Sequence, residues 1–271
     1  MLNFIKNKLF RLCPLFLTGV ILGHMAYMGS AHAAQAPGSF SPKQKKEIGE
    51  VVRQYLLDNP SVILEVSQKI RTQQMQAAEK QAIKVIGENI HELDSALSPT
   101  LGNPAGHIVL VQFMDYQCGH CKQMQAILTK LIADNPDLKI VSKNLGILGA
   151  NSEYAAKASL AANKQAKFQP FHALLEQTSA PLSPEKIQAL AQQAGLDVAK
   201  LEADITSGDV TKEMASSLEL AQKIGLGGTP AFIVFSNIPS EKTKVFFAAG
   251  AVSQAVLQNY INQSKGQSKI Q

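Results

Sequence analysis

FMDYQCGHC, residues 113–121, holds a pair of cysteines at a spacing suited to redox chemistry. Its first two residues end a short apolar run rich in β-branched residues, His107 to Met114, which is typical of a buried strand. Cys118 then begins a helix that we expect to run to about Ala133. Two thiols three residues apart at a helix start lie close enough to form a disulfide, and the free amides there favour the thiolate of the first. A thiolate with a partner thiol at this distance is what disulfide exchange requires.

The residues around the cysteine pair suggest further roles. His120, between the two cysteines, supplies positive charge or a hydrogen bond when a sulfur is anionic. Tyr116 and Gln117 are expected to make the preceding turn polar and exposed. Asp115, at the strand end, allows two interpretations: a buried carboxylate that assists proton transfer at the second cysteine, or a solvated turn residue.

Other uses of a CxxC pair fit this chain less well. A disulfide across so short a loop stabilises little. A zinc site needs two more ligands, and after removal of a leader the chain offers no second cysteine pair and only four histidines: His91, His107, His120 and His172. Haem attachment needs a histidine directly after the second cysteine, where this chain has Lys122. We assign no role to Lys122 or His172. A binding or envelope-structural protein whose CxxC holds copper or closes a turn stays open as an alternative.

A second motif, GGTPAF, occupies residues 227–232. A proline directly before an apolar strand, after two glycines, suits a tight turn whose Thr229–Pro230 bond is either trans or cis. In the cis case the backbone of Thr229 would face the CxxC and hydrogen-bond an extended substrate segment, as in strand addition.

The chain between and beyond these motifs alternates strands and helices. Further strands are expected at 138–145, 231–235 and 244–250, and a last helix near Ser253. Residues 150–224 are rich in Ala, Gln, Lys and Leu, with proline and glycine breaks that divide them into several short helices. This order predicts an α/β domain with a helical insertion.

The first 33 residues resemble a secretory signal peptide. Lys6, Lys8 and Arg11 precede a mostly apolar stretch from Leu12 to Met28, and Ala31-His32-Ala33 provides a small–x–small cleavage pattern. Cleavage would remove three of the 26 basic residues and leave 23 against 21 acidic ones, so the formal charge of +5 belongs mostly to the leader. We therefore expect an exported, periplasmic protein with no nucleic-acid partner.

Residues 34–97 are predicted to be helical. Ser41, Pro42 and Gln44 are start signals for a first helix with one apolar face. A second helix would run over about 60–93, on the order of 50 Å, with a middle that is mostly polar. Such a helix spans solvent or meets a copy of itself, unless it packs as a single surface helix on its own domain.

Two parts of the sequence resemble a known family. FMDYQCGHC followed about a hundred residues later by GGTPAF is similar to DsbA-type thiol–disulfide oxidoreductases of the thioredoxin superfamily, over about residues 100–265. The stretch YLLDNP, residues 55–60, resembles the oligomerising N-terminus of the Com1-like and suppressor-of-copper-sensitivity members. The resemblance implies a thioredoxin-like fold over 98–271, with its helical insertion at about 150–224, after an all-helical dimerisation region at 34–97.

The resemblance also implies roles for individual residues. Cys118 would be the attacking thiol, Cys121 the resolving thiol and Pro230 the cis-proline, with no cofactor other than the redox-active disulfide. Gly119-His120 resembles protein disulfide isomerase, and Thr229 resembles the dimeric isomerases DsbC and DsbG, where the monomeric oxidases have Pro-His and Val. The reduction potentials of isomerase-type sites lie about 60 mV below that of DsbA. An isomerase-type site therefore has about 2.8 kcal/mol less driving force to donate a disulfide.

The implied function is the formation or isomerisation of disulfides in exported proteins. The partners implied are unfolded or misfolded exported proteins with thiols or disulfides, and a membrane redox protein of DsbB or DsbD type. A second copy of this chain, bound through residues 40–95 to form a homodimer, is the third implied partner.

Overall fold

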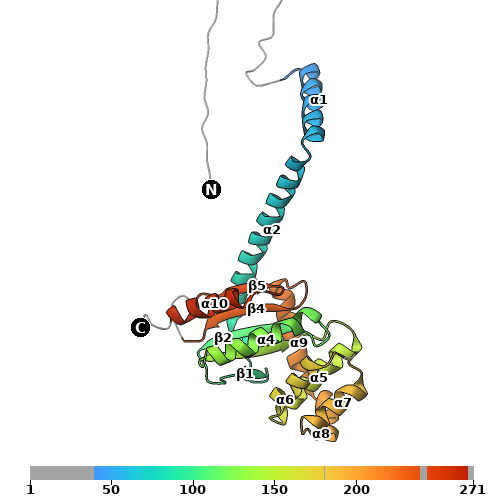
Figure 1. Ribbon diagram of the computed structural model, residues 1–271, viewed down its shortest axis with the longest axis vertical. Helices are drawn as coiled ribbons and strands as arrows, with labels where there is room; N and C mark the ends of the chain where they lie inside the picture. The colour runs from blue at the N-terminus through green and yellow to red at the C-terminus, as the bar shows by residue number, and fades with distance from the viewer. Residues whose placement is uncertain (1–39, 180, 239–242, 268–271) are drawn as a thin grey trace, which may run out of the picture. The chain divides into compact units, whose positions relative to one another are not determined.

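The computed structural model describes residues 40–179, 181–238 and 243–267, so the signal peptide expected over 1–33 lies outside the described residues (Figure 1). The chain divides into two compact units between Val62 and Ile63. The helices that are described include none with the length and apolar character needed to cross a membrane.

The first unit contains helix α1, Pro42–Asp58. It begins with the expected capping box: the Ser41 hydroxyl accepts from the Gln44 amide, and the Gln44 side chain accepts from the Ser41 amide. None of the residues of α1 is buried, and its apolar face carries Ile48, Val51, Val52 and Tyr55. The helix therefore has an apolar face with nothing of its own unit to cover it.

Helix α2, Ser61–Glu88, is the long helix expected from the sequence, and the short helix α3, Ile90–Leu93, follows it. Of the 28 residues of α2 only Ala82 and Ile86 are buried. They join the core of the second unit together with Leu93 of α3. The C-terminal turns of α2 are therefore part of the folded domain, whereas its middle stays exposed.

A five-stranded sheet forms the centre of the second unit, in the order β1-β3-β2-β4-β5. Its strands are β1 Thr100–Gly102, β2 Ile108–Met114, β3 Leu138–Asn144, β4 Ala231–Ser236 and β5 Phe246–Ala249. β2 and β3 run parallel, and the other neighbours are antiparallel. The sequence predicted four of these strands; β1 was expected to be part of a loop, and with three residues it is too short for a periodic signal.

Helices cover both faces of the sheet. Side chains of β2 alternate between the faces: Val109, Val111 and Phe113 meet the end of α2 and the helix α9, Gly208–Ile224. Ile108 and Leu110 point to the other face, toward α4, Gly119–Asp134, and α10, Gln254–Gln267. This central strand is buried along its whole length, so the turn that follows it starts from a fixed position.

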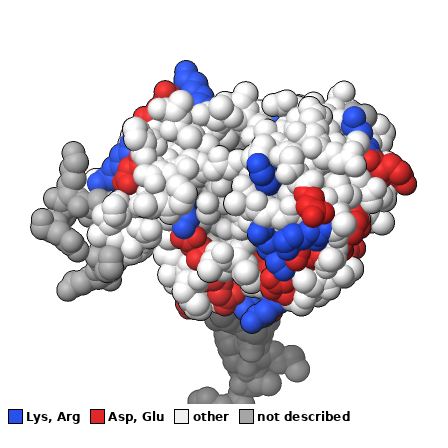
Figure 2. Space-filling view, turned by 90° about the horizontal axis from the view of Figure 1, so that it is seen from below, with Lys and Arg blue, Asp and Glu red and all other residues white. Residues whose placement is uncertain are grey.

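The helical insertion lies to one side of the sheet (Figure 1). It contains α5 Ala150–Lys164, α6 Phe168–Gln177, α7 Pro184–Gln193 and α8 Val198–Ile205, and α9 leads back to β4. The core of the insertion is continuous with the buried residues around the two cysteines. On the face drawn in Figure 2, charged side chains of both signs lie next to one another, and much of the surface is uncharged.

Candidate active site

The strand register brings the two sequence motifs together. Phe113, near the end of β2, pairs with Ala231 at the start of β4. The turn after β2 therefore meets the loop before β4, although more than a hundred residues separate them in the sequence. The Thr229–Pro230 peptide bond in that loop is cis.

Cys118 and Thr229 are in direct contact. The Cys118 thiol donates a hydrogen bond to the Thr229 carbonyl at 3.4 Å, and its sulfur accepts one from the Cys121 amide at 3.4 Å. Cys118 is the N-cap of α4 and keeps 8% of its surface exposed, whereas Cys121, one turn into the helix, has none. The predicted attacking thiol is thus the accessible one, and the predicted resolving thiol lies behind it.

Both cysteines are free thiols in this structure. Burial raises the pKa of the Cys121 thiol to about 12, more than the opposing contact with Thr229 lowers it. Near neutral pH Cys121 therefore keeps its proton unless a neighbouring group accepts it.

His120 lies on the exposed side of the cysteine turn. Its Nδ1 is 3.3 Å from the side-chain oxygen of Gln123, one turn further along α4. Within the part of the chain that the structure describes, no hydrogen bond is found between His120 and either thiol. Its role at the sulfur stays a prediction.

Asp115 is buried, so its interpretation as a solvated turn residue is wrong. Its carboxylate accepts four hydrogen bonds, from the amides of Gln117, Ile147 and Leu148 and from the hydroxyl of Ser152. Because a carboxylate offers about four acceptor positions, these donors occupy the group. Asp115 ties the cysteine turn to the loop before α5, and its part in proton transfer stays a prediction.

Tyr116 does not lie on an exposed turn as expected. Its ring is fully buried, and its hydroxyl is 2.9 Å from Nδ1 of His172 in α6. Burial raises the pKa of Tyr116 and lowers that of His172 to about 4, so both side chains are neutral near pH 7. The aromatic ring is drawn inward because the helical insertion covers this side of the turn.

Glu176, one helical turn after His172, was not found by sequence reasoning. It is buried, and both of its carboxylate oxygens lack a hydrogen-bond partner among the described residues. Burial raises the pKa of Glu176 to about 7; Lys122 opposes this effect and Asp115 adds to it. The helical spacing of the buried residues of α6 could have revealed Glu176 from the sequence. Two of these residues, His172 and Glu176, are ionisable. The buried residues are Phe168, Phe171, His172, Leu175 and Glu176.

Lys122 also has a defined position. Its ammonium group donates to the carbonyl of Thr178, the C-cap of α6, at 2.6 Å. The residue directly after Cys121 thus ties α4 to the end of the helix that carries Glu176.

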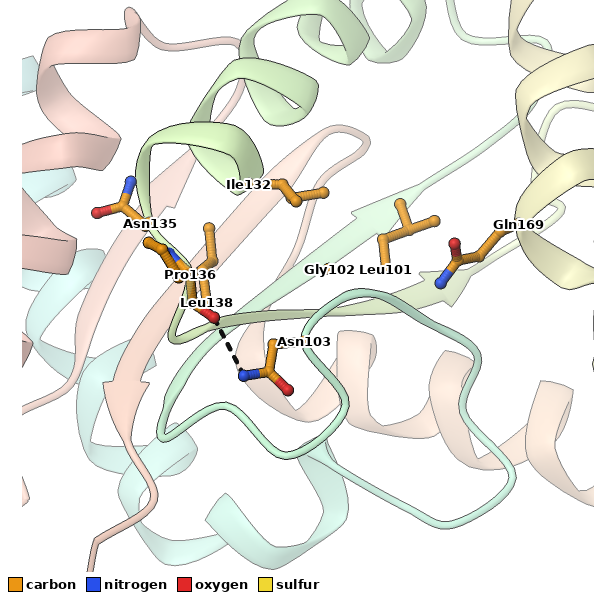
Figure 3. Close-up of a pocket in the computed structure, with 8 residues that line it drawn as sticks. All are labelled: Leu101, Gly102, Asn103, Ile132, Asn135, Pro136, Leu138 and Gln169. Carbon is orange, nitrogen blue, oxygen red and sulfur yellow. Dashed lines mark hydrogen bonds between the residues drawn. The ribbon is translucent and has the colours of Figure 1, made fainter.

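An apolar groove of about 770 Å³ lies beside the cis-proline within the second unit. Its walls come from the loop 224–230, from residues 247–250 of the β5 end, and from α2 and α10. A second hollow, of about 460 Å³, lies at the start of β3, where Leu138 pairs with the first residue of β2, at the opposite end of the sheet from the cysteines (Figure 3). The residues that line this hollow are Leu101, Gly102, Asn103, Ile132, Asn135, Pro136, Leu138 and Gln169. None of them has a titratable side chain, so the hollow supports no acid–base or redox chemistry.

A thioredoxin-like sheet, a cysteine pair at the start of a helix and a cis-proline facing it define a thiol–disulfide oxidoreductase. The chain belongs to the family of DsbA-like oxidoreductases: the family model described as DSBA-like thioredoxin domain matches residues 109–262. A second model, described as Copper resistance protein ScsC N-terminal domain, matches residues 44–77. The resemblance drawn from the sequence motifs and the thioredoxin-like fold are thereby confirmed.

Solved structures agree with this assignment. A thioredoxin-like oxidoreductase from Silicibacter pomeroyi DSS-3 is 34% identical, with a TM-score of 0.59, over 65% of this chain and 96% of that one. BcfH of Salmonella enterica Typhimurium is 27% identical, with a TM-score of 0.67, over 83% of this chain and 97% of that one. ScsC of Proteus mirabilis in a transitional conformation is 26% identical, with a TM-score of 0.59, over 84% and 100%.

The chain spans a quarter or less of the length of the curated relatives that it matches. One of them is Na(+)/H(+) antiporter NhaA 1 of Salinispora arenicola, which is 23% identical over 164 residues, or 58% of this chain and 25% of that protein.

Proposed function

We propose that this protein forms and isomerises disulfide bonds in exported proteins through Cys118 and Cys121. One observation carries the proposal: the accessible Cys118 sulfur lies 3.4 Å from the carbonyl before the cis-proline, with the buried Cys121 one turn behind it. A substrate that reaches Cys118 therefore also reaches the backbone of Thr229, which borders the apolar groove.

The donation of a disulfide takes two exchanges. A substrate thiolate attacks Cys118 of the oxidised pair; the Cys118–Cys121 bond breaks, a substrate–Cys118 disulfide forms, and Cys121 leaves with the electron pair and takes up a proton. A second substrate thiolate then attacks the substrate sulfur of this mixed disulfide, and Cys118 leaves as thiolate. The substrate loses two electrons and the cysteine pair gains them. Isomerisation starts instead from the reduced pair, when the Cys118 thiolate attacks a wrong disulfide.

Cys118→Ser tests the reaction. The variant should lose insulin reduction and the refolding of scrambled ribonuclease, because serine supplies no thiolate. Thr129→Ser, an exposed change on the same helix, is the matched control. Unchanged activity of Cys118→Ser would refute the proposal. The alternative function, copper held by the reduced pair, requires stoichiometric copper binding without turnover of disulfide substrates.

The protein is further proposed to act in the periplasm as a homodimer joined through residues 40–95. The exposed apolar face of α1 supports this, since Val51 is 69% and Tyr55 56% exposed. Val51→Glu should lower the sedimentation mass to that of a monomer, retain insulin reduction and lose isomerase activity. Arg53→Glu, on the opposite side of α1, is its control. A mass that Val51→Glu leaves unchanged would argue against this interface.

The redox partner is proposed to be a membrane protein of DsbB or DsbD type. A DsbB-type partner would keep Cys118 and Cys121 oxidised, as an oxidase requires, and a DsbD-type partner would keep them reduced, as an isomerase requires. Thiol trapping in intact cells, followed by mass spectrometry, measures which state prevails.

A further inference from the structure

Ile147 and Leu148 are two large apolar side chains that the fold leaves in contact with water. They are 46% and 51% exposed. In the described part of the chain after residue 90, the only other exposed large apolar side chains are Leu97 and Val256. Val256 lines the apolar groove beside the cis-proline. The exposed apolar surface of this domain is therefore concentrated in few places, and the position of Ile147 and Leu148 relative to the cysteines becomes the next question.

The loop that carries Ile147 and Leu148 is tied to the cysteine turn. The amides of these two residues donate to the buried Asp115 carboxylate at 2.8 and 3.1 Å. The same carboxylate accepts from the amide of Gln117, the residue directly before Cys118. The Gln117 side chain donates in turn to the Leu148 carbonyl at 3.5 Å. One carboxylate thus fixes both apolar residues beside the reactive cysteine.

Two glycines give this loop a backbone path that other residues rarely take. Gly146 has a φ of 58° and Gly149 a φ of 109°, both in the left-handed region. A Cβ atom at Gly146 would lie 2.7 Å from the Cα atom of Glu153 in α5, so the loop packs too closely against the helix for a side chain there. The outward position of the two apolar residues between these glycines is therefore fixed by the loop itself.

The strand order places this pair and the cis-proline on opposite sides of Cys118. The strand β2, which leads to Cys118, has β3 on one side and β4 on the other. The loop with Ile147 and Leu148 follows β3, and the cis-proline directly precedes β4 at the same end of the sheet. Neighbouring strands lie about 4.8 Å apart, and an extended chain advances about 3.3 Å per residue. A chain bonded to Cys118 therefore reaches the pair within about three residues of its own cysteine.

The chemistry of this surface indicates what binds there. Residues 145–149 read LGILG and include no charged side chain. Exposed apolar side chains that lie together are typical of binding surfaces, because covering them removes apolar area from water. An unfolded exported protein, the client of the proposed exchange, presents apolar side chains that its own fold has not yet buried. The surface adjoins the exchange site, so the chain that reacts at Cys118 is also the chain that covers it.

We propose that Ile147 and Leu148 form a second contact site for the client, on the side of Cys118 away from the cis-proline. They select client segments that carry apolar residues within about three positions of the reacting cysteine. The inference rests on the proposed exchange function and names the class of segment on which it acts. The pair contacts the client as the mixed disulfide with Cys118 forms, and takes no part in the transfer of electrons.

Peptide kinetics test this selectivity. The oxidised protein is mixed with an excess of a single-cysteine peptide; two peptide thiols lose their hydrogens and join as a disulfide while the Cys118–Cys121 bond is reduced. One peptide has leucine, and the other serine, at the three positions on each side of its cysteine. Acid quenching and mass spectrometry give the two second-order rate constants.

The wild-type protein should react faster with the leucine peptide. In the double variant Ile147→Ser, Leu148→Ser the rate with the leucine peptide should fall about tenfold, because the exposed halves of two large apolar side chains are no longer covered by the peptide. The rate with the serine peptide should change by less than about twofold, because serine side chains gain little from an apolar surface.

Controls separate this role from a structural one. Leu97→Ser makes the same change at a leucine that is 42% exposed and lines a small hollow with residues of α5 and α9, and it should retain both rates. Reduction of the double variant by glutathione, which has no apolar side chain, should stay at the wild-type rate. Equal losses with both peptides and glutathione would mean that the loop acts on Cys118 through Asp115, and would overturn the proposal. Two unchanged peptide rates would overturn it as well.

Other occupants of this surface give different results. If the double variant kept its preference for the leucine peptide but had a lower sedimentation mass, a second copy of the chain would cover the pair. If it kept that preference but was reoxidised more slowly by bacterial inner-membrane vesicles, the redox partner would cover it. Either result would overturn the proposal. A wild-type protein that reacts with glutathione but shows no leucine preference would refute this inference alone, whereas failure to react with glutathione or with either peptide would refute the exchange function itself.

Discussion

The difference in the free energy of unfolding between Glu176→Gln and the wild type should depend on pH, and this dependence reports directly on the buried carboxyl group of the wild type. Burial raises the pKa of Glu176 from its ordinary 4.5 to about 7, so the folded state binds this proton more tightly than the unfolded state does. Below pH 4.5 the group is protonated in both states. Between pH 4.5 and 7 the unfolded chain releases the proton while the folded chain keeps it, so stability falls as the pH rises.

The size of the effect follows from the same values. At about 1.4 kcal/mol for each tenfold change in proton affinity, the full cost above pH 7 is about 3 kcal/mol. Glutamine has nearly the same volume and no charge to bury, so the variant escapes this cost. The free energy of unfolding of Glu176→Gln, relative to the wild type, should therefore increase by about 3 kcal/mol between pH 4 and pH 8.

His172 does not disturb this comparison. Its pKa is lowered to about 4, so the unfolded state takes up its proton first as the pH falls, and its contribution to stability is lost below about pH 6.5. This contribution has the opposite sign to that of Glu176, but both proteins contain His172, and it cancels in the difference between them.

Urea denaturation from pH 4 to pH 8, with equal denaturant slopes for the two proteins, measures this difference. Glu202→Gln, a change at a half-buried side chain of α8 that accepts from Tyr154 and Gln188, is the matched control for the exchange of carboxylate for amide. A difference that stays constant over the whole range would refute the reasoning, because it would mean that the Glu176 carboxyl ionises alike in the folded and unfolded chains.

Two further predictions concern the thiols and the core. Iodoacetamide at pH 7 should modify Cys118 at least about a hundredfold faster than Cys121, because Cys121 has no exposed surface and a pKa raised to about 12; peptide mass spectrometry measures both rates, and comparable rates would contradict the geometry. Lys143→Met should cost about 3–5 kcal/mol in urea denaturation, because it leaves Glu213 as a buried carboxylate without its cation, 2.9 Å away in the wild type. Adding Glu213→Leu should recover most of that loss, and no recovery would argue against a charge effect.

The sequence predicted the parts of the fold that have strong local signals. The β-branched run at residues 107–114 predicted β2 to within one residue, and Cys118, after the turn that follows this run, predicted the start of α4. The strand β1 could not be found this way, because three residues show no period and its pairing with β3 is a tertiary contact. Tyr116 was misplaced for a similar reason: its neighbours are polar, but the helical insertion buries it from another part of the chain.

The reactive pair was predicted from its spacing and from its place between a strand and a helix, whereas its proton chemistry was not. Cys118 and Cys121 are three residues apart, so their proximity is a local property of the helix start. The contact between Cys118 and Thr229 depends on the register of β2 against β4, and the sequence supported it only because both motifs were present.

Two carboxyl groups near the cysteine pair show why the rest requires a structure. Asp115 is three residues from Cys118, and from the sequence it is the natural proton carrier; in the fold, two of its four donors are backbone amides of a loop more than thirty residues away. Glu176 is distant in the sequence and has no donors at all among the described residues. A carboxylate whose acceptor positions are filled anchors the chain around it, whereas burial without donors disfavours the charged form of a carboxyl group. The number of donors that the fold delivers, and not the distance along the chain, therefore distinguishes the two groups: Asp115 anchors the cysteine turn, whereas Glu176 is a buried carboxyl group whose pKa burial raises to about 7.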